Sequence, residues 1–303
     1  YQRRVRGIFI SMGHISKIGF AGFGCVNGGA YKIIREQFPA YKDFVIFVRH
    51  PEKHPDVSTT QNCKDLFSCD VILEALTDEQ LSYDIIKEAL TRRIHVVSAS
   101  KSAIYQHLEE FLAIAKANNV QFRFEAAVMS GTPLVQMLSN TFELKSMRGI
   151  LNGTSNFILS RISEGMQFEQ ALQEAQTLGY CEKDPSADID GLDAAKKLLI
   201  CLKVNAANSQ EKKDFKLEDV RMKSIRNCGT KNTKQIASSV NGELRVQPEI
   251  LDAADPLLAV NGVDNAVELD FEYLGKVFLK GPGAGSLQTG YGMVCDLISC
   301  CKQ

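Results

Sequence analysis

The sequence contains no tryptophan and only five histidines, and it carries no excess of either charge. All five histidines lie at or before His107, so the second half of the chain cannot form an acid–base centre on an imidazole. The 35 basic and 36 acidic residues give a net charge of −1, which offers no electrostatic footprint for nucleic acid or an anionic membrane. No apolar run approaches the length of about 18 residues that a transmembrane helix needs. We therefore expect a small-molecule substrate rather than a nucleic acid or membrane partner.

The nine cysteines are odd in number and irregular in spacing, and no C-x-x-C pair occurs. This pattern argues against a zinc ribbon or a disulfide framework, and no Cys/His cluster suits a catalytic zinc. Free thiols are typical of a reducing compartment, so we expect a cytoplasmic protein. Residues 1–11 are basic, lack the apolar core of a signal peptide and are expected to lie outside the fold.

From about residue 15 to residue 145, short apolar segments alternate with helical patterns. The expected strands are 17–21, 44–48, 70–75, 94–98 and 121–124, and the expected helices are 30–37, 79–91 and 101–118. Strands that alternate with helices indicate parallel βαβ units and a doubly wound sheet. The predicted fold class is therefore α/β with an N-terminal Rossmann-type domain, which we place at residues 12–145.

Beyond residue 145 the pattern changes to that of an α+β domain. Helical segments at 168–178 and 192–201 precede segments typical of antiparallel strands at 233–240, 243–248, 266–271 and 274–279. We assign residues 146–285 to a second domain for substrate binding, catalysis and dimerisation. The apolar segment 289–301 predicts a last helix, within residues 286–303, that packs back on the first domain and completes it.

A glycine-rich loop follows the first strand at once. Gly22 allows a tight turn, Gly24 lets the backbone approach a pyrophosphate, and the next helix offers free N–H groups and a positive dipole end. This order of strand, loop and helix predicts dinucleotide binding, although Asn27 occupies the third fingerprint position. The predicted contacts in the loop are Gly22, Phe23, Gly24, Cys25, Val26 and Asn27.

The end of the second strand distinguishes between the two nicotinamide cofactors. An acidic residue there binds the ribose 2′-hydroxyl of NAD, but this chain has Arg49, whose guanidinium suits a 2′-phosphate. We therefore expect NADP to be preferred to NAD. Thr77, which follows the third strand, is a further predicted cofactor contact.

An enzyme that uses this cofactor on an alcohol or a carbonyl needs a proton donor and acceptor. No cysteine has an activating histidine or an evident position at a helix N-terminus, which leaves lysine. Asp193 and Lys197 lie four residues apart in a predicted helix, so they share one face and the carboxylate can hold the ammonium. Glu182, in the preceding loop, can bind a substrate ammonium. The alternative is a solvated acidic loop with surface ion pairs.

The segments Gly149–Leu159 and Leu178–Lys197 closely resemble the signature of homoserine dehydrogenases. Further matches at Ala99–Lys101 and Gly281–Gly285 extend the resemblance over nearly the whole chain from Lys17. The resemblance implies the NAD(P)-dependent interconversion of L-homoserine and L-aspartate 4-semialdehyde, a step in threonine, methionine and isoleucine biosynthesis.

The resemblance also implies roles for individual residues. Lys197 matches the catalytic proton donor, Lys101 matches the lysine between nicotinamide and substrate, and Asp193 matches the acid that supports the substrate hydroxyl and the lysine. The remaining matches are Glu182, which binds the amino group of homoserine, Thr154 and Tyr180, which line the substrate pocket, and Gly283, in a turn that closes near the cofactor.

A monovalent cation, Na⁺ or K⁺, is also implied, at a loop where Glu125, Val128, Ser130 and Thr132 match the family's positions. Family analogy further implies a homodimer. The run Ser98–Lys101 reads Ser-Ala-Ser-Lys where the family has Thr-Ala-Asn-Lys. Because the sequence ends soon after the last predicted helix, no C-terminal regulatory domain is expected.

Two alternatives remain open from the sequence. An aspartate semialdehyde dehydrogenase would need a nucleophilic cysteine and a phosphate site, and neither is evident. A sensor that binds NAD(P) without turnover would respond to the cofactor but show no homoserine-dependent reduction. The combination of Lys101, Glu182, Asp193 and Lys197 argues against the sensor.

Overall fold

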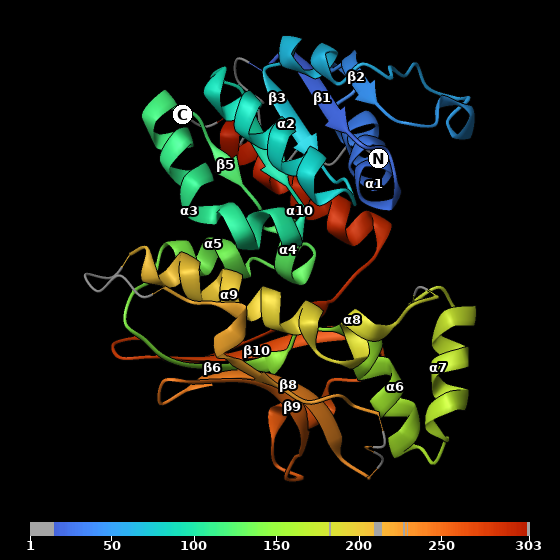
Figure 1. The fold of residues 1–303 in the computed structure, drawn as a ribbon, viewed down its shortest axis with the longest axis vertical. Coiled ribbons are helices and arrows are strands. Elements are labelled where there is room, and N and C mark those ends of the chain that lie inside the picture. The colour runs from blue at the N-terminus through green and yellow to red at the C-terminus, as the bar shows by residue number, and fades with distance from the viewer. Residues whose placement is uncertain (1–14, 182, 209–213, 227, 229, 302–303) are drawn as a thin grey trace, which may run out of the picture.

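The computed structural model describes residues 15–181, 183–208, 214–226, 228 and 230–301. This part of the chain forms two lobes, each built on one β-sheet (Figure 1). Within it, no helix is both long enough and apolar enough to cross a membrane.

In the described part of the chain, the first sheet has five parallel strands in the order β2-β1-β3-β4-β5. They are β1 (Lys17–Ala21), β2 (Asp43–Phe47), β3 (Val71–Glu74), β4 (His95–Ser98) and β5 (Phe122–Arg123). From β1 the chain passes to β2 on one side and then returns to β3 on the other, so the order of connection reverses between β1 and β3. Doubly wound proteins bind ligands outside the carboxyl ends of the strands at such a point. The predicted Rossmann-type class is confirmed.

Helices cover both faces of this sheet, which explains why its strands are apolar on both sides. On one face lie α1 (Cys25–Gln37) and α10 (Ser286–Cys300), and on the other α2 (Glu79–Thr91) and α3 (Lys101–Asn118), while the short helices η1 (Pro51–Lys53) and η2 (Cys63–Ser68) connect β2 to β3. Phe20 packs with Ile34 and Leu297 on the first face, and Ile72 packs with Ile86 on the second.

The second sheet is mixed, with the order β11-β10-β6-β8-β9-β7. Its strands are β6 (Leu144–Ile150), β7 (Val220–Met222), β8 (Thr233–Val240), β9 (Glu243–Ile250), β10 (Asp264–Phe271) and β11 (Gly275–Pro282). Neighbouring strands are antiparallel except for β7 and β9. The two-residue turn between β8 and β9 has positive φ at Asn241 and Gly242, which suits a tight hairpin.

One helix, α9 (Leu192–Ala206), lies between the two sheets (Figure 1). It packs against α3 on one side and against β8 and β9 on the other. Its apolar side chains join a single core that includes Ile72 of the first sheet and Leu198, Val246 and Leu269 of the second lobe. The remaining elements are α4 (Ala126–Met129), α5 (Leu134–Ser139), α6 (Gly153–Ser163), α7 (Phe168–Thr177), α8 (Ser186–Ile189), η3 (Leu217–Asp219) and η4 (Pro256–Ala259).

The element boundaries depart from the sequence expectations mainly at helix ends. Helix α1 begins at Cys25 instead of Ala30, and α9 continues to Ala206, past the expected end at residue 201. The low helix propensity of Asn27, Gly28 and Gly29 favours the later start, but tertiary packing overrides it. Small residues in this turn are what let the neighbouring helix approach.

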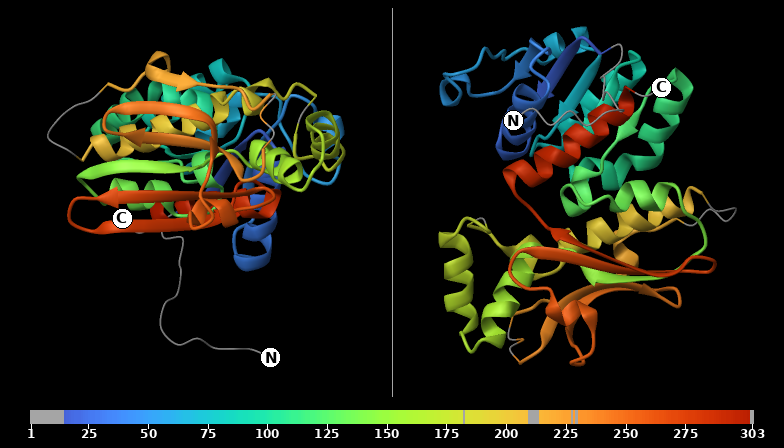
Figure 2. Two further views of the ribbon diagram at one scale, coloured as in Figure 1. Left: turned by 90° about the horizontal axis from the view of Figure 1, so that it is seen from below. Right: turned by 180° about the vertical axis from the view of Figure 1, so that it is seen from behind.

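That neighbour is α10, which crosses α1 at very short range and can be followed in Figure 2. A Cβ atom placed on Gly29 would lie 2.0 Å from the backbone oxygen of Ser286, and one on Gly290 would lie 2.4 Å from the backbone nitrogen of Ala30. The Ser286 hydroxyl donates a 2.7 Å hydrogen bond to the Cys25 carbonyl oxygen. The C-terminal helix therefore packs back on the first lobe, with no space at the crossing for a Cβ atom at Gly29 or Gly290.

This crossing yields a test of stability with an internal control. We expect Gly29→Ala to lower the free energy of unfolding by about 1–3 kcal/mol, because the added methyl group would meet backbone that cannot move aside. The adjacent Gly28→Ala adds a Cβ with no atom within 4 Å and should leave stability unchanged or raise it by up to about 1 kcal/mol. Urea unfolding of both variants measures the difference, and equal stabilities would contradict the described crossing.

Candidate active site

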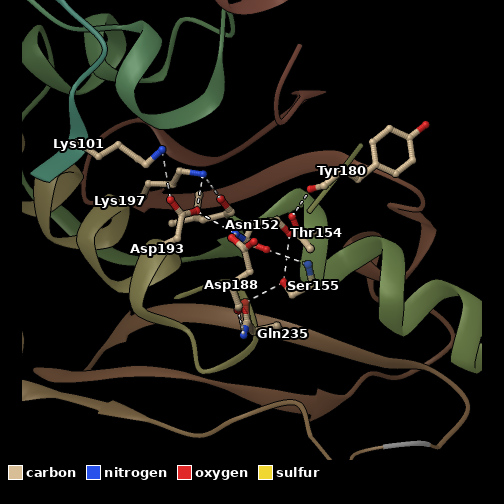
Figure 3. A network of polar contacts seen from close by, with 10 residues as sticks. Lys101, Asn152, Thr154, Ser155, Tyr180, Asp188, Asp193, Lys197 and Gln235 are labelled. Atoms are coloured by element: carbon tan, nitrogen blue, oxygen red, sulfur yellow. Dashed lines mark hydrogen bonds and ion pairs between the residues drawn. The ribbon is translucent and has the colours of Figure 1, made fainter. Parts of the chain in front are cut away.

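Asp193 and Lys197, which the sequence places on one helix face, form a buried ion pair on α9 (Figure 3). Lys197 Nζ lies 2.8 Å from Asp193 Oδ2 and donates a 2.8 Å hydrogen bond to the Leu151 carbonyl oxygen. The Lys197 side chain is 8% exposed and that of Asp193 is 12% exposed, so bulk water screens neither charge well. The alternative of a solvated surface pair is therefore wrong for these two residues.

Lys101 approaches the same carboxylate from the first lobe. It is the first residue of α3, and its Nζ lies 3.4 Å from Asp193 Oδ1. Burial lowers the pKa of Lys197 and the charge of Lys101 lowers it further, whereas Asp193 opposes both effects. Burial alone would raise the pKa of Asp193, but the two ammonium groups outweigh it and hold that pKa well below its usual range. The cluster thus contains a firmly ionised carboxylate and an amine that releases its proton more readily than an ordinary lysine.

Asn152 belongs to the cluster, although sequence reasoning assigned it no role. Its Nδ2 donates to Asp188 Oδ1 at 2.6 Å and to Asp193 Oδ2 at 2.9 Å, and its Oδ1 accepts the Ser155 N–H at 2.8 Å as the N-cap of α6. Burial raises the pKa of Asp188, against the lowering effect of the Asn152 hydrogen bond. The asparagine before Gly-Thr-Ser is a recognisable helix-start signal, but it does not indicate the two carboxylates that the amide also binds.

The predicted pocket residues Thr154 and Tyr180 lie together beside this cluster. Thr154 Oγ1 donates a 2.7 Å hydrogen bond to the Tyr180 carbonyl oxygen, and the Tyr180 ring packs edge-on against Phe157 at a centroid distance of 5.1 Å. The Tyr180 side chain is largely exposed, as a residue that meets a diffusing substrate would be. Glu182, predicted to bind the substrate amino group, lies outside the described residues.

The glycine loop presents the N-terminus of α1 to open space. Gly22 has φ 81°, and Gly24 occupies the N-cap position of α1. A Cβ placed on Gly24 would meet no atom within 4 Å, and the first turn of α1 contains no acidic residue. Free N–H groups and a positive dipole end therefore face outward, which is the arrangement that binds pyrophosphate. Phe23 and Val26 are half-buried and pack on the apolar cluster beneath the loop.

Asn27 behaves differently from the rest of the loop. Its side chain is fully buried, and Nδ2 donates to the carbonyl oxygens of Ala21, Gly22 and Leu73 at 3.2, 2.8 and 3.0 Å. The side chain therefore does not face the cofactor position that the sequence predicts for it. The Asn27 amide links the glycine loop to β1 and β3 through hydrogen bonds inside the fold.

Cys25 lies at a helix N-terminus, contrary to the prediction that no cysteine does. It is the first residue of α1, and its side chain is exposed. The late predicted start of α1 hid this position. Cys25 belongs to the glycine loop and not to the lysine cluster on α9.

Arg49 lies just beyond the carboxyl end of β2, where the sequence places it. Its Nη2 lies 2.5 Å from Asp78 Oδ2, so the N-cap residue of α2 holds the guanidinium in place while its side chain remains 56% exposed. Thr77, the residue before Asp78, is also exposed. Gly283 follows β11 and its N–H donates to the Val263 carbonyl oxygen at 3.2 Å.

The predicted cation loop surrounds α4 and contains Glu125, Val128, Ser130 and Thr132. The Glu125 carboxylate is buried and accepts the N–H groups of Val135 and Gln136 at 2.8 and 2.7 Å, so it already has partners. Among the residues that the structure describes, no group of three or more His, Cys, Asp or Glu side chains could hold a metal ion.

Two family models match the chain. The model described as "Homoserine dehydrogenase, NAD binding domain" matches residues 22–125, and the model described as "Homoserine dehydrogenase" matches residues 132–298. Among curated proteins, the homoserine dehydrogenase of Sulfurisphaera tokodaii is 37% identical over 220 residues, which cover 72% of this chain and 71% of that protein.

Solved structures agree with these matches. A homoserine dehydrogenase from Thiobacillus denitrificans has a TM-score of 0.87 at 28% identity, covering 94% of this chain and 73% of that one. A hyperthermophilic archaeal homoserine dehydrogenase in complex with NADPH has a TM-score of 0.83 at 29% identity, covering 94% of this chain and 97% of that one.

The position of Asn152 between two carboxylates generates a prediction about stability. Asn152→Asp keeps the shape and the cap but replaces the shared donor with a third negative charge. We expect the variant to lose about 1–3 kcal/mol relative to the unmodified protein. The loss should grow between pH 5 and pH 8, because crowding raises the pKa values of the carboxyls in the folded state. The stability that the folded protein gains by binding protons at low pH is then lost as pH rises. Urea unfolding at both pH values is the measurement, and a loss that shrinks with pH would contradict the described contacts.

Proposed function

The chain belongs to the homoserine dehydrogenase family, and we propose that Lys197, Asp193 and Lys101 carry out its proton transfer between L-homoserine and L-aspartate 4-semialdehyde. The protein is an NAD(P)-dependent oxidoreductase. The observation that carries the proposal is a buried lysine amine held at 2.8 Å by an ionised carboxylate, with a second ammonium on the other side of that carboxylate. No feature of the described residues favours the aspartate semialdehyde dehydrogenase or the sensor.

The glycine loop and Arg49 would hold the cofactor. The N-terminus of α1 behind Gly22 and Gly24 suits the pyrophosphate, and the Arg49 guanidinium suits a 2′-phosphate, which favours NADP over NAD. When bound, the nicotinamide supplies or accepts the hydride. The other proposed contacts are Phe23, Cys25, Val26, Thr77, Lys101 and Gly283.

Lys197 moves the proton. In the direction of reduction its ammonium Nζ donates a proton to the oxygen of the semialdehyde carbonyl, and in the direction of oxidation the neutral Nζ accepts the hydroxyl proton of homoserine. The lowered pKa makes the neutral amine easier to form than in an ordinary lysine. Asp193 orients Nζ, and the nearby charge of Lys101 stabilises the oxygen on which negative charge develops.

The substrate wall is formed from the second lobe. Thr154 and Tyr180 line the pocket beside the lysine cluster, and their 2.7 Å hydrogen bond fixes the loop after α7 against the start of α6. Glu182, two residues beyond Tyr180 in the sequence, binds the substrate amino group in this proposal. A carboxylate there matches the positive charge that both homoserine and the semialdehyde carry on the α-amino group.

Several further features are proposals. The two sheets support a division into a cofactor domain at residues 12–145 with 286–303 and a catalytic domain at 146–285. Exposed Val240, Ile250 and Phe278 on the second sheet support a homodimer through that lobe.

The nine free cysteines suit the reducing cytoplasm. Backbone carbonyl oxygens of the loop around α4 would coordinate Na⁺ or K⁺.

Removal of the Lys197 amine tests the proposed function. We expect Lys197→Ala to lower kcat by roughly 10²–10⁴-fold, because the reacting oxygen loses its proton donor and acceptor. Lys197→Arg should not restore turnover, because a guanidinium does not release its proton. Lys203→Ala, on the same helix, is the control and should keep normal turnover. Absorbance of the reduced nicotinamide gives the rates. Near-normal turnover of Lys197→Ala would contradict the role of Lys197 as proton donor and acceptor.

Substitutions of Asp193 and of Lys101, the two charged neighbours of Lys197, should shift the pH profile of kcat/KM in opposite directions. Homoserine oxidation requires the neutral amine, so kcat/KM rises as pH passes the pKa of Lys197. Asp193 raises this pKa and Lys101 lowers it. We therefore expect Asp193→Asn to move the acid limb to lower pH, and Lys101→Ala to move it to higher pH, each by about one unit. Profiles that shift in the same direction, or not at all, would contradict the cluster's electrostatics.

A further inference from the structure

A buried carboxylate that this mechanism does not use is connected by hydrogen bonds to the residue before Lys101. Glu74, the last residue of β3, is fully buried. Its carboxyl group accepts the Leu76 N–H at 2.8 Å and the Ser98 hydroxyl at 2.5 Å, and it lies within hydrogen-bond distance of the Ser82 hydroxyl. No lysine, arginine or histidine of the described residues contributes to its environment as a charge partner. Such a site is unusual, because buried carboxylates are ordinarily paired with a cation.

The same hydrogen bonds reach the N-terminus of α3. Ser98 Oγ accepts the Ser100 N–H at 3.1 Å, and the Ser100 hydroxyl donates to the Leu76 carbonyl oxygen at 3.2 Å. Ser82 Oγ lies 2.9 Å from Ser100 Oγ. Ser100 occupies the N-cap position of α3, yet its side chain makes no capping bond to the helix, because its hydroxyl belongs to this buried network. The next residue, Lys101, is the first of the helix.

The pattern of donors fits a Glu74 that carries a proton. Ser82 has one hydroxyl hydrogen but lies in donor position to both Glu74 and Ser100. A protonated Glu74 donates to Ser82, Ser82 donates to Ser100, and Ser100 donates to the Leu76 carbonyl, so each contact has its own hydrogen. Burial without a cation also raises the pKa of Glu74, which favours this state.

We propose that Glu74, Ser82, Ser98 and Ser100 are positioning residues for Lys101. They fix the first turn of α3 to the carboxyl ends of β3 and β4, and so set how close the Lys101 ammonium lies to Asp193 and to Lys197. The proposal rests on the role proposed above for Lys101. It gives a role to four buried polar side chains that the proposed proton transfer does not use.

The test compares two alanine variants with the Lys101→Ala variant as reference. Ser98→Ala and Ser100→Ala each remove one link between Glu74 and the start of α3. We expect kcat for homoserine oxidation to fall by about tenfold to a hundredfold, because small displacements of a reacting group are costly. The KM for NADP should change less than kcat, because Lys101 is one of several proposed cofactor contacts. The acid limb of kcat/KM should move to higher pH, as in Lys101→Ala, because Lys197 loses the influence of a fixed neighbouring charge.

The shift of the pH profile separates positioning from a general structural role, which would lower the melting temperature without moving the limb. Ser68→Ala, which removes an exposed hydroxyl that donates to the Asp65 carbonyl oxygen away from this network, is the control and should behave as the unmodified enzyme. Glu74→Gln keeps the size and the neutrality of a protonated carboxyl, so we expect it to retain the wild-type limb. If one alanine variant does not fold, the other and Glu74→Gln decide the question.

The outcomes are distinguishable. If Lys101→Ala leaves the limb in place, the role proposed for Lys101 fails. If Lys101→Ala moves the limb but the folded serine variants do not, the positioning proposal alone is overturned. A shifted limb in Glu74→Gln would mean that a charge on Glu74 acts on the lysines directly, and it would overturn the proposal in its stated form.

Discussion

The structure depends on the ion pair between Lys197 and Asp193, which lies between the two lobes with almost no contact with water. Two isolated charges at such depth would destabilise the fold by several kcal/mol each, so their surroundings must compensate for the loss of hydration. The Leu151 carbonyl oxygen accepts from the amine, and the Asn152 amide donates to the carboxylate. Removal of either charge takes away the nearest partner of the other, so the pair constrains its neighbours more tightly than an apolar contact of equal size would.

The arrangement of elements follows from that constraint. Helix α9 carries both members of the pair and packs on α3 of the first lobe and on the second sheet, so it joins the two lobes. Helix α3 brings Lys101 to the same carboxylate from the cofactor lobe. Asn152 is the N-cap of helix α6, so the cap and the Asp193 carboxylate share one amide side chain. The C-terminal helix α10 packs against α1 behind the glycine loop and closes the first lobe. Each lobe thus supplies part of one site.

Much of this could be predicted from local pattern. The alternation of strands and helices indicated the first sheet, the boundaries of β8 match the expected 233–240, and the four-residue spacing of Asp193 and Lys197 indicated their contact. These features succeed because period, spacing and turn chemistry are local properties of the sequence. The early start of α1 was missed because Gly28 and Gly29 have poor helix propensity, and only the distant α10 explains their presence.

The contacts that sequence reasoning missed are those that join distant segments through polar side chains. Asn152 reads as a helix cap, and nothing local reveals that its amide also bridges Asp188 and Asp193. Asn27 reads as an altered fingerprint residue, yet its amide holds three backbone carbonyl groups from inside the fold. In both cases one amide side chain satisfies several groups that the fold brings together, and such satisfaction is visible only in three dimensions.

The proposed proton transfer requires the protein interior to lower the pKa of the Lys197 amine enough for it to exchange a proton with substrate. The most direct measurement is a pH titration of the lysine Nζ resonances by NMR in ¹⁵N-labelled protein, with Lys197 assigned from the spectrum of Lys197→Arg. We expect the Lys197 resonance to titrate well below the ordinary lysine pKa of about 10.4. A Lys197 amine that stays protonated up to or beyond that value would contradict the proposed proton transfer.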